Sequence, residues 1–269
     1  MNTALRISAA GFLLFLALGA AGAPWLAPKG YAEQFRESPL QPPGRSFPLG
    51  TDELGRDLLA RTLYGTRISL LLAAAAAALC TLTGSAVGVI AGFTGGLADA
   101  ILSRFSMLLL SLPWMFLVLA VRAALPLDLP PEQSVWITFA TLAAVGWAAP
   151  AQVVAASARG LRRSNFALRA RAEGGGAMRV LFRQVAPNLR TVVFSQFLAV
   201  LPAFVLSEAT LSLLGLGVAE PLPSWGVLLR GLEDPAAVAG RPWRLIPLLL
   251  LLLTTASMQI LGAKQVHKT

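Results

Sequence analysis

The chain has 269 residues, of which 56% are hydrophobic and 13% charged, and its mean hydropathy is +0.68. Because a water-soluble domain carries roughly 25% charged residues, this composition excludes an ordinary soluble domain. The net charge of +9 does not indicate nucleic-acid binding, because most of the excess arginine lies in one segment between apolar stretches and forms no basic patch with aromatic side chains.

Six apolar segments are long enough to cross a bilayer, which takes roughly 20 residues of helix. Each must be helical, because lipid offers no partner to backbone N–H and C=O groups. We therefore expect an all-α integral membrane protein with about six transmembrane helices. Pro113, Pro150 and Pro202 lie in or near these segments and are expected to kink them. The six segments cover residues 5–26, 68–93, 105–125, 135–156, 192–216 and 245–261.

The first segment has two interpretations. Arg6, the apolar stretch and Ala21-Gly22-Ala23 resemble a secretory signal peptide with its cleavage site. We favour a retained transmembrane helix, because Pro24 would follow the cleaved bond and the apolar stretch exceeds the 7–15 residues usual in signal peptides.

Lys and Arg residues in short loops predict the orientation. Residues 157–190 carry eight arginines against the single acid Glu173, so we expect this segment in the cytoplasm. Both termini then lie in the cytoplasm, and the loops at 27–67 and 218–244 lie outside. The arginines are Arg159, Arg162, Arg163, Arg169, Arg171, Arg179, Arg183 and Arg190.

The segment before the second span is predicted to hold a short amphipathic helix. Thr51 or Asp52 is a suitable N-cap, and the acids that follow suit the positive end of a helix dipole. The leucines of the next stretch fall near one face, as in an interfacial helix that lies on the membrane. They are Leu54, Leu58, Leu59 and Leu63.

Two short helices are predicted within residues 164–188. Ser164 or Asn165 can cap the first, the three glycines at 174–176 must break it, and a second can run from 177 to 185 and stop before Pro187. Its apolar residues, placed on one side, are Met178, Leu181, Phe182 and Val185. The segment is either a docking element for a partner or a loop at the lipid headgroups.

Glu208 is the acid that lies well inside a predicted span. Ionisable groups in membranes generally face a bundle interior or a wet cavity, so Glu208 is either a structural hydrogen-bonding group or a transport-pathway residue. With one His (His267) and one Cys (Cys80), we expect no metal site and no cofactor. No phosphate-binding P-loop motif occurs, so a different chain must bind ATP if ATP drives the protein.

Four stretches resemble the inner-membrane permease subunits of dipeptide, oligopeptide and nickel ABC importers, in particular the second permease of the pair. The likeness covers nearly the whole chain and implies the type I ABC importer permease fold. The matching stretches are Pro48–Asp57 with Leu63–Ser69, Gly95–Asp99 with Arg104, Phe182–Asn188, and Ser207–Gly217 with Pro223–Gly226.

The resemblance implies a division of the chain into a first transmembrane helix (1–28), an extracytoplasmic loop with an interfacial helix (29–67), a five-helix permease domain (68–264) and a cytoplasmic tail (265–269). Within the permease domain, residues 157–190 would be the coupling loop that docks on the ATPase. Gly174 and Ala170 stand at the family's glycine and second alanine, whereas Leu168 and Arg169 replace its Glu and first Ala.

By the same resemblance, one set of residues would contact the ATPase, and a second set would lie at the outer face or support the pathway. The expected partners are a homologous permease, two cytoplasmic ATP-binding subunits, an extracytoplasmic substrate-binding protein and membrane lipid, in the plasma membrane of a prokaryote. The coupling set is Phe166, Leu168, Ala170, Gly174, Arg183 and Pro187; the outer set is Asp52, Arg56, Asp57 and Trp225, with Glu208 supporting the pathway.

Two other classes remain open. A secondary transporter or channel would need polar groups or broken helices near the membrane midplane, where Glu208 is nearly alone. A membrane enzyme would need a nucleophile with a base, or a metal cluster, within the spans, and no His or Asp partners the available Ser and Thr there.

Overall fold

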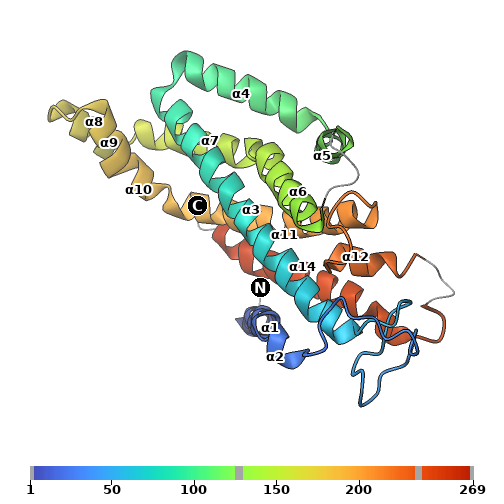
Figure 1. Cartoon of the computed structure of the whole chain (residues 1–269). Helices are drawn as coiled ribbons and strands as arrows, with labels where there is room; N and C mark the ends of the chain where they lie inside the picture. Colours follow the sequence, from blue (N-terminus) through green and yellow to red (C-terminus); the bar gives the residue numbers. More distant parts are fainter. Residues whose placement is uncertain (1–2, 125–129, 234–237, 267–269) are drawn as a thin grey trace. The chain divides into compact units, whose positions relative to one another are not determined.

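The computed structural model describes residues 3–124, 130–233 and 238–266, and its regular elements within these ranges are helices (Figure 1). An isolated antiparallel bridge joins Thr51 to Asp57. The elements are α1 (Thr3–Ala21), α2 (Ala23–Leu26), α3 (Leu58–Thr94), α4 (Gly96–Ser111), α5 (Trp114–Ala123), α6 (Pro131–Gly146), α7 (Ala148–Arg162), α8 (Asn165–Ala172), α9 (Ala177–Val180), the π-helical turn η1 (Leu181–Val185), α10 (Ala186–Asn188), α11 (Arg190–Leu213), α12 (Trp225–Arg230), the 3-10 turn η2 (Pro242–Leu245) and α14 (Ile246–Val266).

Five helical stretches of the described chain are long and apolar enough to cross a membrane, and α4 with α5 makes a sixth if the two count as one span. The expected number of about six is therefore confirmed. The five stretches are Thr3–Ala21, Leu58–Thr94, Pro131–Arg162, Arg190–Leu213 and Pro242–Gly262.

The third segment differs from the continuous span expected over 105–125. It consists of α4 and α5, which meet at an angle of 82°. The break falls at Leu112, whose backbone is extended (φ −84°, ψ 135°), because the ring of Pro113 disfavours helical geometry in the residue before it. In contrast, α11 continues through Pro202. The end of the predicted span, Leu125, lies outside the described residues.

The second span begins earlier than predicted. Leu58, Leu59 and Leu63 form the first turns of the 37-residue helix α3, so the separate interfacial helix is not formed. The cap is Asp57 and not Thr51 or Asp52: its Oδ1 accepts hydrogen bonds from the backbone N–H groups of Leu59 (2.8 Å) and Ala60 (3.4 Å). The first N–H groups of a helix have no partner inside the helix. The Asp57 carboxylate provides that partner, so the helix begins directly after it.

The chain divides into two compact units, which are described separately. The first comprises Met1–Ala75, Arg122–Ala140 and Leu201–Leu261, and the second comprises Ala76–Val121, Thr141–Val200 and Gly262–Thr269.

Glycines bring α3 against α7 in the second unit. Gly84, Gly88 and Gly92 recur every four residues and so share one face of α3. A Cβ on each would collide with the backbone of α7, at the carbonyl oxygens of Trp147, Ala151 and Ala155 respectively. Small residues permit this close approach. In a bilayer the hydrophobic effect does not drive helices together, so close packing of this kind is a main source of helix association.

Polar contacts then hold α4 beside α7 (Figure 1). Gln152 of α7 donates a hydrogen bond to the carbonyl oxygen of Ser103 (3.0 Å), and Arg159 pairs with Asp99 at 2.5 Å. Both pairs join residues about 50 to 60 positions apart in sequence. These contacts therefore fix the position of α4 along α7.

Candidate functional site

A charged cluster in the first unit begins with the turn before α3. The Oδ1 atom of Asp52 accepts hydrogen bonds from the backbone N–H groups of Leu54 and Arg56, both at 2.9 Å. Gly55 lies between them with φ +73°, a conformation that favours glycine. This turn points the Arg56 side chain back onto Asp52, where its Nε lies 2.7 Å from Oδ2.

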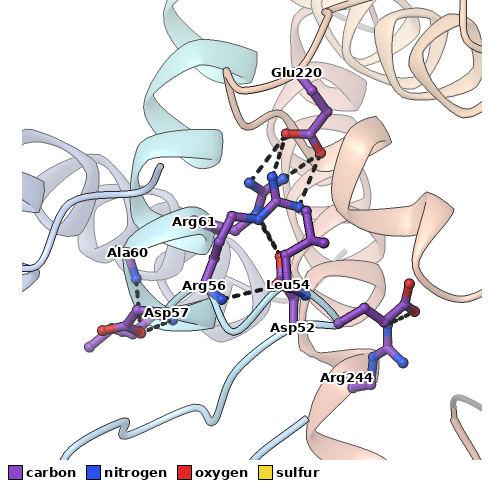
Figure 2. A network of polar contacts seen from close by, with 10 residues as sticks. Asp52, Leu54, Arg56, Asp57, Ala60, Arg61, Glu220 and Arg244 are labelled. Atoms are coloured by element: carbon purple, nitrogen blue, oxygen red, sulfur yellow. Dashed lines mark hydrogen bonds and ion pairs between the residues drawn. The ribbon is translucent and has the colours of Figure 1, made fainter. Parts of the chain in front are cut away.

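Two arginines of this cluster converge on one carboxylate, that of Glu220 (Figure 2). Arg56 Nη1 lies 2.8 Å from Oε2 of Glu220, and Arg61 Nη2 lies 2.8 Å from Oε1. The second Nη atom of each arginine reaches the other oxygen, at 3.4 Å for Arg56 and 3.3 Å for Arg61. Such paired, charge-assisted contacts are the strong class of hydrogen bond. We call Arg56, Arg61 and Glu220 the arginine clamp.

A cavity of about 340 Å³ adjoins the arginine clamp, within the same unit. Its lining combines both signs of charge with the apolar side chains of Val227, Leu228 and Pro247. Glu53, on the same wall, pairs with Arg244 at 2.9 Å. The cavity is therefore suited to a small ligand that carries charged and apolar groups together.

Glu208 belongs to a different network, in which its partners are hydroxyl groups. Its side chain is fully buried, and it accepts hydrogen bonds from the hydroxyls of Ser69 (3.0 Å) on α3 and Ser212 (2.7 Å) on α11. Ser69 accepts in turn from the backbone N–H of Trp225 (3.1 Å). Of the two interpretations of Glu208, the structural hydrogen-bonding one matches these contacts.

Three members of the predicted outer set are buried and not exposed. Asp57 caps α3, and Asp52 holds the turn that carries Arg56. The Trp225 side chain is fully buried, and its indole N–H donates to the hydroxyl of Thr66 at 3.0 Å. The sequence does not reveal this burial, because an acid or a tryptophan in a loop resembles a surface residue until its partner helix is known.

The predicted coupling segment lies in the second unit and consists of α8, α9, η1 and α10, drawn in yellow and ochre in Figure 1. The expected break between its helices is confirmed: Gly174 has φ +82°. Ser164 is the N-cap of α8, but its hydroxyl donates to the carbonyl of Leu161 and makes no side-chain cap bond. The second helix does not stop before Pro187, which lies in α10.

The inner face of this segment packs onto the ends of α3 and α7. A core cluster holds Phe93, Val154 and Ala158 together with residues of the segment. Ala170 packs against its edge, and the Arg171 guanidinium lies 5.2 Å from the centre of the Phe93 ring. The buried residues that the segment contributes are Ala167, Val180, Leu181, Val185 and Leu189.

The outer face combines apolar and basic side chains. The exposed fractions are 69% for Met178, 66% for Phe182 and 51% for Leu168, and Phe166 reaches 37%. The predicted single face with Met178, Leu181, Phe182 and Val185 is therefore wrong, because Leu181 and Val185 point into the core. The exposed arginines here are Arg169, Arg179 and Arg183.

The structure adds residues that the sequence did not single out. Arg61 and Glu220 complete the clamp, and Ser69, Ser212 and Ser224 surround Glu208 and Trp225. The contacts of Arg61 with Glu220 and of Ser69 with Glu208 join segments about 140 to 160 residues apart, which no local pattern reveals. In the described part of the chain, no three His, Cys, Asp or Glu side chains come together as a metal site.

The apolar helices, the charged cavity and the exposed basic segment between two spans define a multi-pass membrane permease. Residues 84–264 match the family described as binding-protein-dependent transport system inner membrane component, and the chain belongs to this family. Its fold is accordingly that of type I ABC importer permeases, the fold expected from the sequence.

Three proteins that are similar to nearly the whole chain are named as peptide transport permeases. The dipeptide transport system permease protein DppC of Bacillus subtilis is 32% identical over 93% of this chain and 76% of its own length. The di/tripeptide transport system permease protein DppC of Pseudomonas aeruginosa is 32% identical over 93% of this chain and 82% of its own. The oligopeptide transport system permease protein OppC of Haemophilus influenzae is 32% identical over 93% of this chain and 79% of its own length.

Proposed function

We propose that this chain is one permease subunit of an ATP-driven importer of peptides or related small solutes. It forms the translocation pathway with a homologous permease and receives substrate from an extracytoplasmic binding protein. The observation that supports this most strongly is the likeness, over 93% of the chain, to three proteins named as peptide transport permeases. The chain has no P-loop motif, so the ATP-binding subunits are separate chains.

In this proposal the segment 164–188 docks on the ATPase. Its inner face is fixed to the ends of α3 and α7, so a force on its outer face moves those helices instead of a loose loop. Phe166, Leu168, Phe182 and Met178 supply apolar contact area, and Arg183 lies beside them. Ala170, Gly174 and Pro187 shape the segment and do not themselves provide large contacts.

The arginine-rich segment then lies in the cytoplasm, and both termini lie on the same side. By the same count of spans, the loops that carry the arginine clamp and its cavity are extracytoplasmic. ATP binding would shift the spans between inward-facing and outward-facing arrangements, which is a change in the populations of two states. Asp57, Glu208 and Trp225 hold the helices at the outer end in register, and Asp52 and Arg56 face the cavity.

The test is co-purification of the ATPase. A tagged wild-type chain, expressed with its genomic neighbours and extracted in mild detergent, should bring down a P-loop ATPase. Phe182→Asp should abolish this, because the exposed phenyl ring is replaced by a charge inside the contact. Leu54→Asp is the matched control, since Leu54 is also half-exposed (49%) but lies in the other unit.

Failure of the wild-type chain to bind an ATPase would refute the importer. Transport by the chain without any ATPase would instead support a secondary transporter or channel.

A further inference from the structure

We propose that Arg56 and Arg61 form a binding site for the C-terminal carboxylate of a short peptide, and that Glu220 occupies this site in the present structure. The inference rests on the proposed function for the class of ligand. Its chemistry, a carboxylate held by two guanidinium groups, follows from the contacts of the arginine clamp alone (Figure 2).

Asp52 contacts both arginines from the side opposite Glu220, and it forms a hydrogen bond to Arg56. The side chain of Arg61 is 2% exposed, that of Arg56 is 11% exposed and that of Asp52 is 12% exposed. The Oδ2 atom of Asp52 lies 2.7 Å from Arg56 Nε and 3.6 Å from Arg61 Nε. Asp52 thus contacts the Nε edges of both guanidinium groups, and their Nη atoms face the carboxylate of Glu220. A planar guanidinium presented this way is suited to a carboxylate.

Glu220 is the most exposed member of the cluster. Its side chain is 42% exposed, and it belongs to a segment about 160 residues away in sequence. Without Glu220, Asp52, Arg56 and Arg61 carry formal charges of −1, +1 and +1, which leave a net charge of +1. One carboxylate neutralises this charge. The carboxylate of Glu220 and that of a peptide C-terminus are chemically equivalent in this respect, so either can fill the site.

The adjoining cavity provides space for the rest of a peptide. Its volume of about 340 Å³ lies within the range of small-ligand sites. Glu233 on its wall can attract the N-terminal ammonium group, and Val227, Leu228 and Pro247 can contact apolar side chains. A zwitterion with apolar substituents therefore complements the whole lining and not only the clamp.

Occupation of the clamp by Glu220 has a measurable consequence. A ligand that must displace an internal competitor has a weaker apparent affinity. Its Kd is the intrinsic Kd divided by the fraction of time that the site is free. Removal of Glu220 should therefore strengthen binding of a carboxylate, whereas removal of an ordinary contact residue would weaken it.

The experiment measures binding of dialanine and of its C-terminal amide to the purified full-length chain in detergent, by calorimetry. Glu220→Ala is expected to bind dialanine about tenfold or more tightly than the wild type, and the amide no better than the wild type does. Arg61→Ala added to Glu220→Ala should remove the gain. Glu33→Ala is the matched control, because Glu33 is an exposed acid of the same unit outside the clamp.

Folding is checked separately with Glu220→Gln, which keeps the side-chain volume. Acetate should raise the melting temperature of both Glu220 variants but not that of the wild type. Equal affinity for the acid and the amide, or no gain in the Glu220 variants that remain folded, would overturn the inference. So would loss of binding-protein docking in Arg56→Ala without any preference for free carboxylates, because the clamp would then hold an acidic side chain of that protein.

The two proposals can fail separately. The binding experiment needs no ATPase, so a selective carboxylate site would survive refutation of the importer. Normal ATPase association without carboxylate selectivity would refute this inference alone.

Discussion

The glycines of α3 provide the sharpest test of how this fold is held together. In Gly84→Ala, the new Cβ would lie 2.5 Å from the carbonyl oxygen of Trp147 and 3.2 Å from the Cβ of Pro150. Ordinary van der Waals contact begins at 3.4 Å, so α3 and α7 must separate by about 0.9 Å (3.4 − 2.5) at this point. The obstacle is backbone and cannot rotate away, so we expect a loss of about 1–3 kcal/mol, as for overpacked cores.

The assay is thermal unfolding of the purified chain in detergent, followed by tryptophan fluorescence. Gly160→Ala is the control: Gly160 lies in α7, and a Cβ there would meet nothing within 4 Å. It should leave stability unchanged or raise it by up to about 1 kcal/mol, because alanine is the better helix former. Equal melting temperatures for Gly84→Ala and the wild type would refute the conclusion that glycine sets the distance between α3 and α7.

Three further predictions concern the first unit and use the same unfolding assay. Asp57→Ala should destabilise the chain by about 0.5–2 kcal/mol through loss of the α3 cap, and Asp57→Asn by much less, since asparagine also caps helices; equal losses would contradict the capping role. Trp225→Phe should cost about 1–2 kcal/mol, because the indole bond to Thr66 is lost in a fully buried site. Glu208→Ala should cost about 2–4 kcal/mol by leaving a cavity and unpaired hydroxyls, and Glu208→Gln less, because glutamine keeps the volume and one acceptor oxygen; a larger loss in Glu208→Gln would show that the carboxyl group itself is needed.

The spans could be predicted because each depends on a local property, the length of an apolar stretch. The residues at which helices begin were harder to predict, because they depend on which side chain is free to act as the N-cap. Asp52 and Asp57 are both acids before an apolar run, and either can cap a helix by residue type alone. The structure uses Asp57 for the cap because Asp52 is engaged in its own turn and with Arg56. Pro113 marked a break in the third segment, but the angle of 82° depends on packing that a proline does not encode.

The faces of the coupling segment show a different limit. An α-helical period places Met178, Leu181, Phe182 and Val185 on one side. The structure winds Leu181–Val185 as a π-helical turn, in which bonds close over five residues instead of four. The buried face then follows Val180, Leu181 and Val185, and Phe182 points outward. A periodicity read from sequence cannot anticipate a change of period inside the helix.

The polar networks around Glu208 and Glu220 in the first unit differ in whether a solute can replace the acidic side chain. Glu208 is fully enclosed and is held by hydroxyl groups of its own and a neighbouring helix, so no solute can replace it without opening the helix pair. Glu220 contacts two arginines that Asp52 also contacts, and its own side chain is 42% exposed. Substitution of Glu208 should therefore change stability alone, whereas substitution of Glu220 should also change ligand affinity. Exposure of the acid, and not its presence in a polar network, separates a structural group from an exchangeable one.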